Sequence, residues 1–206
     1  MTSGDTREKI GIFGGTFSPP HLGHRLIAQK FVNEINLDKL LIIPTFIPPH
    51  KEYGREASPA ERLEMCRLAF SDIDKAEVSD IEVKRGGVSY TADTLSSLFL
   101  KSRHLFLLVG TDMFISIDTW HMPERIFSLA TVVCVRREND SEAQKLIVKK
   151  KNEYEKKYSA DIILIDNDIL KISSSEIRSE LRLGIYNPSH VPKKVIEYIK
   201  KEGLYK

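Results

Sequence analysis

A glycine turn placed after a strand-like run is the part of this chain best suited to phosphate chemistry. Residues 11–24 read GIFGGTFSPPHLGH, in which an apolar run meets two glycines, a proline-stiffened turn and two histidines. Because Gly14 and Gly15 lack a Cβ, the backbone N–H groups of the turn can approach a phosphate closely. The turn continues through Thr16 and Phe17, and we expect these four residues to bind the phosphates of a nucleotide.

His21 and His24 open the helix that is predicted to follow. Residues three apart at a helix start lie on one side, where two imidazole donors can hold phosphate oxygens and offset charge on a transferring phosphoryl group. The alternatives are an ordinary helix cap, surface histidines or a zinc site, although no third zinc ligand stands nearby in the sequence. Neither GxxxxGK[ST] nor GxGxxG occurs, so the P-loop and the usual dinucleotide fingerprint do not account for this turn.

A second segment with similar chemistry follows the last predicted strand. Residues 172–178 read ISSSEIR. The serines can cap a helix and still present hydroxyl and N–H groups to an anion, with Ser174 among them. Arg178 lies on the side where a guanidinium could bind phosphate oxygens with two hydrogen bonds. Taken alone, this segment would be an ordinary capped surface helix.

Alternating strands and helices must position these residues. Near-continuous apolar runs such as LLII and LFLLV are typical of strands covered on both faces. A helix is expected at 21–36, and SPAE at 58–61 and SSSE at 173–176 have the pattern of a capping box. The order favours an α/β fold, a doubly wound parallel sheet with helices on both faces in three layers. The expected strands are 9–13, 39–44, 77–83, 104–109, 131–135 and 161–165.

The composition describes an ordinary globular chain. With 206 residues, 41% of them apolar, and no long linker, the chain is read as one domain spanning 1–206. A net charge of +2 is too small to indicate a nucleic acid or a membrane as partner, and no apolar run is long enough to span a bilayer. Cys66 and Cys134 are expected to be buried thiols, which suits a reducing compartment. The polar N-terminus is no signal peptide, so we expect the cytoplasm.

The two phosphate-binding segments together resemble a known superfamily. GGTFSPPHLGH looks like the HxGH signature of the nucleotidyltransferases, and ISSSEIR looks like their second motif. The resemblance implies a Rossmann-like fold in which His21 and His24 contact the ATP phosphates, while Ser174 and Arg178 hold the phosphates that leave as pyrophosphate. Members usually carry Asp or Asn where this chain has Ser18, so Ser18 is not assigned to the site.

Further stretches narrow the resemblance to the bacterial nicotinate-mononucleotide adenylyltransferases. They run in order along the chain, as PPHK at 48–51, SYTADTL at 89–95, GTDMF at 110–114, TW at 119–120 and the final GLY at 203–205. The resemblance implies an acceptor site in which Asp112 meets ribose hydroxyls and Trp120 stacks on the pyridine ring. Thr91 would meet the nicotinate carboxylate. His50 and Lys51 would meet the acceptor phosphate or the adenylate.

The residues themselves leave simpler roles open for this set. Thr91 and Asp112 could be helix caps, Trp120 a half-buried packing residue, and the PPHK stretch a solvated loop. The implied reaction is in-line attack of the nicotinate mononucleotide phosphate on ATP, with Mg²⁺ carried by the triphosphate and no metal site on the protein. Other acceptors, namely phosphopantetheine or nicotinamide mononucleotide, and a non-catalytic nucleotide-binding regulator remain alternatives. The sequence does not indicate the oligomeric state.

Overall fold

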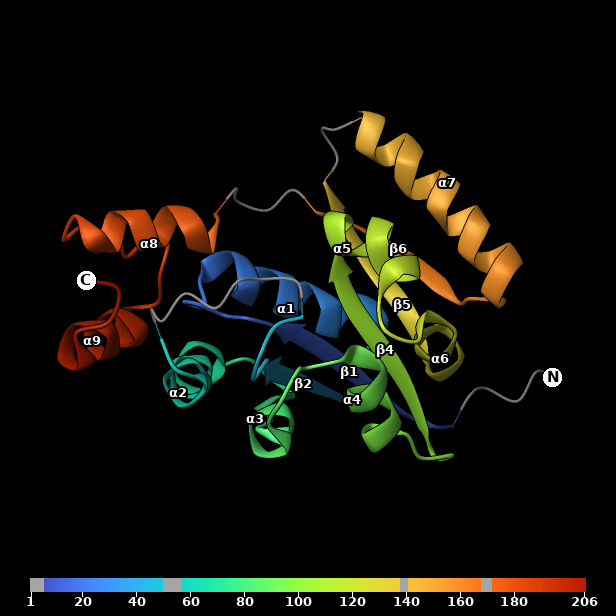
Figure 1. Cartoon of the computed structure of the whole chain (residues 1–206), viewed down its shortest axis with the longest axis horizontal. Coiled ribbons are helices and arrows are strands. Elements are labelled where there is room, and N and C mark those ends of the chain that lie inside the picture. The colour runs from blue at the N-terminus through green and yellow to red at the C-terminus, as the bar shows by residue number, and fades with distance from the viewer. Residues whose placement is uncertain (1–5, 50–56, 138–140, 168–171) are drawn as a thin grey trace. The chain divides into compact units, whose positions relative to one another are not determined.

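The structure, a computed structural model, describes residues 6–49, 57–137, 141–167 and 172–206 (Figure 1). Within these ranges six strands form one sheet in the order β3-β2-β1-β4-β5-β6. The strands are β1 (Glu8–Gly15), β2 (Lys39–Pro44), β3 (Ala76–Val78), β4 (Arg103–Gly110), β5 (Ala130–Arg137) and β6 (Ile162–Asn167).

The sheet has the strand order of a doubly wound α/β fold. The chain adds β2 and β3 on one side of β1 and then β4, β5 and β6 on the other. The pairs β1–β4, β4–β5 and β5–β6 are parallel, for example with Leu105 beside Ile10 and Val133 beside Ile163. The predicted α/β class with a parallel, Rossmann-like sheet is therefore confirmed.

The contacts divide the chain into two compact units. The first unit comprises Met1–Phe13, Phe31–Leu40 and Tyr90–Asp168. Its core lies where β4 and β5 meet the surrounding helices, and Val132, Val133, Ile117 and Ile126 are fully buried there. Its helices are α4 (Thr91–Leu98), α5 (Thr111–Ser116), the 3₁₀ turn η1 (Ile117–Thr119), α6 (Pro123–Leu129) and α7 (Ser141–Tyr158).

Close packing of neighbouring side chains requires a glycine at position 11 of the first unit. A Cβ built on Gly11 would lie 2.4 Å from a methyl carbon of Leu37 and 2.9 Å from the ring of Phe31. Both neighbours are fully buried, so neither side chain can move away without opening the core. Gly11 therefore allows the end of α1 (Leu22–Ile35) and the residues after it to pack directly on β1.

The second unit comprises Gly14–Lys30, Leu41–Ser89 and Ile169–Lys206. Helix α9 packs on α2 there, and Val195, Ile199, Met65 and Cys66 are fully buried. Gly203 has φ +65°, the left-handed conformation that ends α9. The helices of this unit besides the start of α1 are α2 (Pro59–Phe70), α3 (Ile81–Arg85), α8 (Ser174–Arg182) and α9 (Lys193–Glu202).

One expected strand is wrong over most of its length. The prediction of a strand at 77–83 is met only at Glu77 and Val78, the last two residues of β3, after which the chain forms α3. The sequence DIEVKR has an acidic start and a basic end, which favours a helix, and Lys84 pairs with Asp80 at 3.1 Å one turn apart. The other five strands are found within two residues of their expected ends.

The burial of the cysteines agrees with the sequence. Both cysteines are free and fully buried, as expected for small apolar residues of a core. Over the described ranges, no helix has the length and apolar character needed to cross a lipid bilayer.

Candidate active site

The two glycines at the end of β1 differ in their surroundings. A Cβ on Gly14 would meet no atom of the described residues within 4 Å, whereas a Cβ on Gly15 would lie 3.1 Å from the ring of Phe17. Gly15 O accepts the N–H of Thr45 at 2.9 Å, which fixes the turn to the segment after β2. The open side at Gly14 leaves the backbone accessible to a ligand.

His21 and His24 cap the start of α1 reciprocally. His21 immediately precedes the first helical residue, and its Nδ1 accepts the backbone N–H of His24 at 3.3 Å. In return, Nδ1 of His24 accepts the backbone N–H of His21 at 3.2 Å. The two rings stack with their centroids 3.6 Å apart. This arrangement repeats a capping box with two imidazoles in place of the usual serine and glutamate.

The reciprocal bonds fix where each ring carries its proton. Because both Nδ1 atoms accept backbone N–H groups, neither can be protonated, so the single proton of each neutral ring is on Nε2. Burial, and to a lesser extent the nearby His190, lowers the pKa of His21 to about 4. Only 6% of the surface of His21 is exposed. His21 is therefore a neutral Nε2–H donor at neutral pH.

Two buried side chains, those of Phe17 and Arg62, pack at the glycine turn. Phe17 is 2% exposed and its ring meets His24 edge-on at 5.0 Å, so its side chain packs against the histidine and only its backbone is available to a ligand. Arg62, on α2, is also 2% exposed and donates to the carbonyl oxygens of Thr16 at 2.8 Å and Phe46 at 3.1 Å. Arg62 thus ties the glycine turn to the segment that follows β2.

Helix α8 docks its first turn against the same turn of the chain. Ser173 and Glu176 form the predicted capping box. Ser174 donates its hydroxyl to the carbonyl of Pro19 at 3.2 Å, and Arg178 donates to the carbonyl of Ser18 at 3.0 Å. Arg178 also donates to the hydroxyl of Ser175 at 3.1 Å. The second unit therefore brings the two predicted phosphate-binding segments together.

The C-terminal segment reaches the same place. Tyr205 is 3% exposed, and its hydroxyl lies 3.0 Å from the hydroxyl of Ser18. Burial raises the pKa of the Tyr205 hydroxyl, so it remains a neutral donor. Ser18 is thus in contact with Arg178 through its carbonyl and with Tyr205 through its side chain.

Three of the residues expected to meet the acceptor, Thr91, Asp112 and Trp120, are in the first unit. Thr91 is the first residue of α4, half-buried, and Tyr90 occupies the cap position before it. Asp112 is the second residue of α5, exposed, and Gly110 occupies the cap position there. Trp120 follows η1, is half-buried, and donates its backbone N–H to Ile117 at 3.0 Å. The helix-cap alternative is therefore wrong for both Thr91 and Asp112.

Ring contacts bring two of these residues into one neighbourhood. Tyr90, which precedes Thr91, lies with its ring centroid 4.3 Å from that of His121, which follows Trp120. Asp112 lies at the start of the α5–η1 segment that leads to Trp120, and Ser116 donates its hydroxyl to the carbonyl of Asp112 at 3.1 Å. The predicted site residues His50 and Lys51 lie outside the described residues.

The arrangement of the described carboxylates, thiols and imidazoles bears on a possible metal site. Within the described residues, no group of three or more His, Cys, Asp or Glu side chains could hold a metal ion. The glycine turn instead presents backbone N–H groups, and Arg178 beside it a guanidinium, which are donors for anionic oxygens.

Comparison with known proteins decides the family. The sequence model of the cytidylyltransferase-like family matches residues 12–180, which include the glycine turn, both histidines and Arg178. The chain belongs to this family.

Curated relatives within the cytidylyltransferase-like family agree over nearly the whole chain. A probable nicotinate-nucleotide adenylyltransferase of Clostridium botulinum is 35% identical over 199 residues, covering 97% of this chain and 98% of the relative. A protein of the same name from Borreliella burgdorferi is 36% identical over 199 residues and 96% of each chain. The predicted resemblance to the nicotinate-nucleotide adenylyltransferases is thus confirmed.

A solved structure shares the fold. The nicotinic acid mononucleotide adenylyltransferase of Plasmodium falciparum, complexed with NaAD, has a TM-score of 0.76 and is 20% identical, covering 97% of this chain and 98% of that one. The same enzyme complexed with APC has a TM-score of 0.74.

Sequence reasoning missed several residues that the structure places around the turn. Arg62 lies in a helix with apolar neighbours, and nothing in its spacing distinguishes it from a surface arginine. Tyr205 is noticed only as part of a C-terminal pattern, and His190, whose carbonyl accepts the N–H of Leu22 at 2.8 Å, is not singled out at all. Each acts through a contact distant in sequence, which no local pattern predicts.

Proposed function

We propose that this protein transfers the adenylyl group of ATP to nicotinate mononucleotide, producing nicotinate adenine dinucleotide and pyrophosphate. The observation that carries the proposal is the reciprocal histidine pair, joined to Arg178 at one glycine turn, in a chain similar over nearly its full length to nicotinate-nucleotide adenylyltransferases. We expect residues 1–206 to act as one catalytic domain in the cytoplasm.

The reaction needs no nucleophile from the protein. An oxygen of the acceptor phosphate forms a bond to the α-phosphorus of ATP, and the bond from that phosphorus to the bridging oxygen of the β-phosphate breaks. The electron pair leaves with pyrophosphate, so atoms and charge balance without an added reagent. The protein therefore contributes alignment of the two substrates and stabilisation of charge.

The phosphate-binding residues have distinct roles in this proposal. His21 and His24 donate their Nε2–H groups to triphosphate oxygens and stabilise the charge that develops in the transition state. Arg178 and Ser174 bind the β- and γ-phosphates, and the backbone of Gly14, Gly15, Thr16 and Phe17 lines the turn. Mg²⁺ enters as part of the MgATP substrate, where it neutralises the triphosphate.

The acceptor-binding residues contribute recognition. Thr91 and the N–H groups at the start of α4 bind the nicotinate carboxylate, and Asp112 accepts hydrogen bonds from ribose hydroxyls. Trp120 stacks on the pyridine ring, whose positive charge favours an aromatic face by about 0.5–2 kcal/mol. His50 and Lys51 bind the acceptor phosphate. Acid is preferred to amide because a carboxylate accepts hydrogen bonds from the Thr91 hydroxyl and amide groups.

The proposal is tested by offering acceptors separately. Pyrophosphate release is measured with MgATP and nicotinate mononucleotide, nicotinamide mononucleotide or phosphopantetheine. We expect release with the first, and dinucleotide formation in equal amount. Release with only another acceptor would overturn the acceptor assignment, and no release with any would favour a nucleotide-binding regulator.

A further inference from the structure

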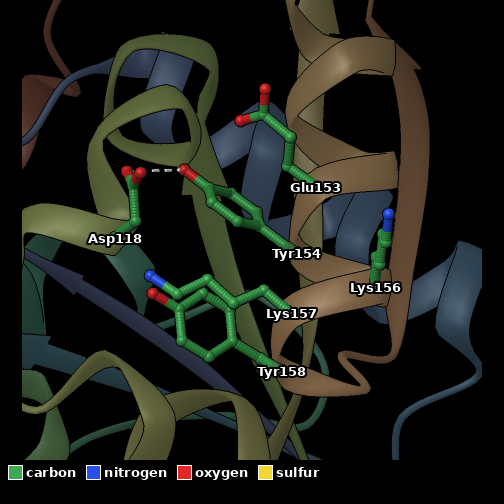
Figure 2. A pocket seen from close by; sticks show the side chains of 6 residues that line it. All are labelled: Asp118, Glu153, Tyr154, Lys156, Lys157 and Tyr158. Atoms are coloured by element: carbon green, nitrogen blue, oxygen red, sulfur yellow. Dashed lines mark hydrogen bonds between the residues drawn. The ribbon is translucent and has the colours of Figure 1, made fainter.

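A polar cluster on α7 joins the segment that carries two of the proposed acceptor-binding residues. Tyr154, 1% exposed, points its hydroxyl at the end of α5 and at η1. Its oxygen lies 2.9 Å from a carboxylate oxygen of Asp118, 3.0 Å from the carbonyl of Ile115 and 3.1 Å from that of Phe114. Figure 2 shows the hydroxyl of Tyr154 directed at Asp118, beside a pocket lined also by residues of α7.

In this cluster the single hydroxyl of Tyr154 lies near three acceptors, and Lys150 contributes a positive charge. A phenol carries a single proton, which we assign to the charged Asp118 because a hydrogen bond to an ionised acceptor is the stronger one. The other oxygen of Asp118 accepts from Lys150 at 2.8 Å. Lys150 also lies 3.5 Å from Glu153 and above the ring of Tyr154. Both carboxylate oxygens of Asp118 thus accept hydrogen bonds from residues of α7.

The charges agree with this assignment. Partial burial opposes ionisation of Asp118, but hydrogen bonds from Lys150 and Tyr154 outweigh it and lower the pKa of the carboxyl. The hydrogen bond to Asp118 in turn raises the pKa of Lys150. Burial, with the bond to Asp118, raises the pKa of Tyr154. At neutral pH the cluster therefore contains a carboxylate, an ammonium and a neutral phenol.

The cluster fixes a short piece of chain that has little support of its own. Helix α5 has six residues and η1 three, and helices this short are marginal without tertiary contacts. Asp112 lies at the start of this piece and Trp120 directly after its end. Asp118 is two residues before Trp120, so its position sets the exit direction of the chain at the indole.

We propose that Tyr154 and Asp118 are positioning residues for the acceptor, which set the placement of Asp112 and Trp120 without touching either substrate. This inference rests on the proposed function. The rings around Tyr154 keep the phenol in place independently of its hydroxyl, because Phe127 and Phe114 pack on it at 5.0 and 5.5 Å. Removing the hydroxyl alone therefore separates the positioning role from core packing.

The test compares Tyr154→Phe with Tyr158→Phe. Each variant loses one hydroxyl from the same helix, but Tyr158 stacks on Phe127 and interacts with Lys157 of its own helix. In Tyr154→Phe we expect KM for nicotinate mononucleotide to rise about tenfold, with KM for ATP within about twofold of wild type. Tyr158→Phe should change neither. Lys150→Met, which removes the second bond to Asp118, should shift KM for the acceptor in the same direction.

A second readout does not depend on turnover. Trp120 is the only tryptophan of the chain, so the intrinsic fluorescence reports on this one position. Titration with nicotinate mononucleotide should quench it, and the midpoint should move in Tyr154→Phe by the same factor as KM. Unchanged KM and quenching in Tyr154→Phe would overturn the positioning role, as would equal rises in both KM values. A wild-type protein that neither turns over nor is quenched would instead contradict the proposed function.

Discussion

In each of the two histidines at the start of α1, the two ring nitrogens have different roles. Each Nδ1 is committed to a backbone N–H of the other residue, at 3.2 and 3.3 Å. Each Nε2 carries the only ring proton, the one that we propose to be donated to the triphosphate. The Nδ1 position therefore serves the fold and the Nε2 position the proposed chemistry, so the two roles are separable by substitution.

Exchanging His24 for its two amide analogues should separate these roles. In His24→Asn the side-chain oxygen takes the place of Nδ1 and keeps the reciprocal bond, but the Nε2–H donor is lost. We expect kcat to fall about 10²–10³-fold, with Tm close to wild type. In His24→Gln the amide reaches the position of Nε2 while the cap is lost, so more activity should remain and stability should fall by about 1 kcal/mol.

Steady-state rates and thermal unfolding of the two variants check this together. The expected pattern is a crossover, in which the more stable variant is the less active. If Asn were as active as Gln, the Nε2 donor of His24 would have no role in turnover. If Asn were markedly the less stable, the reciprocal bond would not be the one that matters to the fold.

At the scale of elements, Arg62 connects two loops that each follow a strand. Its guanidinium is buried on α2 and donates to Thr16 and Phe46. A buried arginine is stable only when its donors are satisfied, and here a fork of two bonds spans two separate segments. The turn that we propose to bind phosphate is thus held in place by a residue that has no expected contact with ATP.

Loss of this fork should weaken ATP binding selectively. In Arg62→Met we expect KM for ATP to rise about tenfold, because the turn carrying Thr16 loses its anchor. Arg62→Lys should restore little, since one ammonium cannot span both carbonyls. Arg67→Met is the matched control, because Arg67 lies on the same helix, is about half exposed and pairs with Glu64 at 3.2 Å. Full rescue by Lys would show that charge, not the fork, is what the turn needs.

The sequence predicts those elements whose signals are local. Apolar runs identify five of the six strands, and the serine–glutamate pattern identifies the starts of α2 and α8. The segment at 77–83 is mispredicted because IEVKR has β-branched residues but also an acidic start and a basic end, and its tertiary setting favours the helix. Local signals thus give the turn, both histidines and α8 without the structure.

The remainder of the site depends on contacts between residues far apart in sequence. Arg62 meets Thr16, Tyr205 meets Ser18, and Tyr154 meets Asp118. An arginine or a tyrosine on a helix has the same sequence pattern whether it is buried in such a contact or exposed to solvent. These supporting residues could therefore not be predicted from spacing, although the residues that they support could.

At the scale of the whole molecule, the free energy of unfolding depends on pH because the fold keeps His21 neutral. Its folded pKa is about 4, below the value near 6.5 of an unperturbed histidine, because burial disfavours the charged ring. Between these two values the unfolded chain binds more protons than the folded one. Stability is therefore fully present above about pH 7 and is lost as the pH falls towards 4.

The loss should be measurable in a window where the carboxylates do not yet titrate. From pH 7.5 to pH 5, we expect His21 to remove about 2 kcal/mol of unfolding free energy, which corresponds to roughly 4–8 °C in Tm. The lowered pKa values of Asp72 and Asp118 place their own losses below this window. In His21→Asn the amide keeps the cap but cannot titrate, so most of this acid sensitivity should disappear. An equal decline of Tm in both proteins would mean that another group is responsible, and that His21 is not held neutral by the fold.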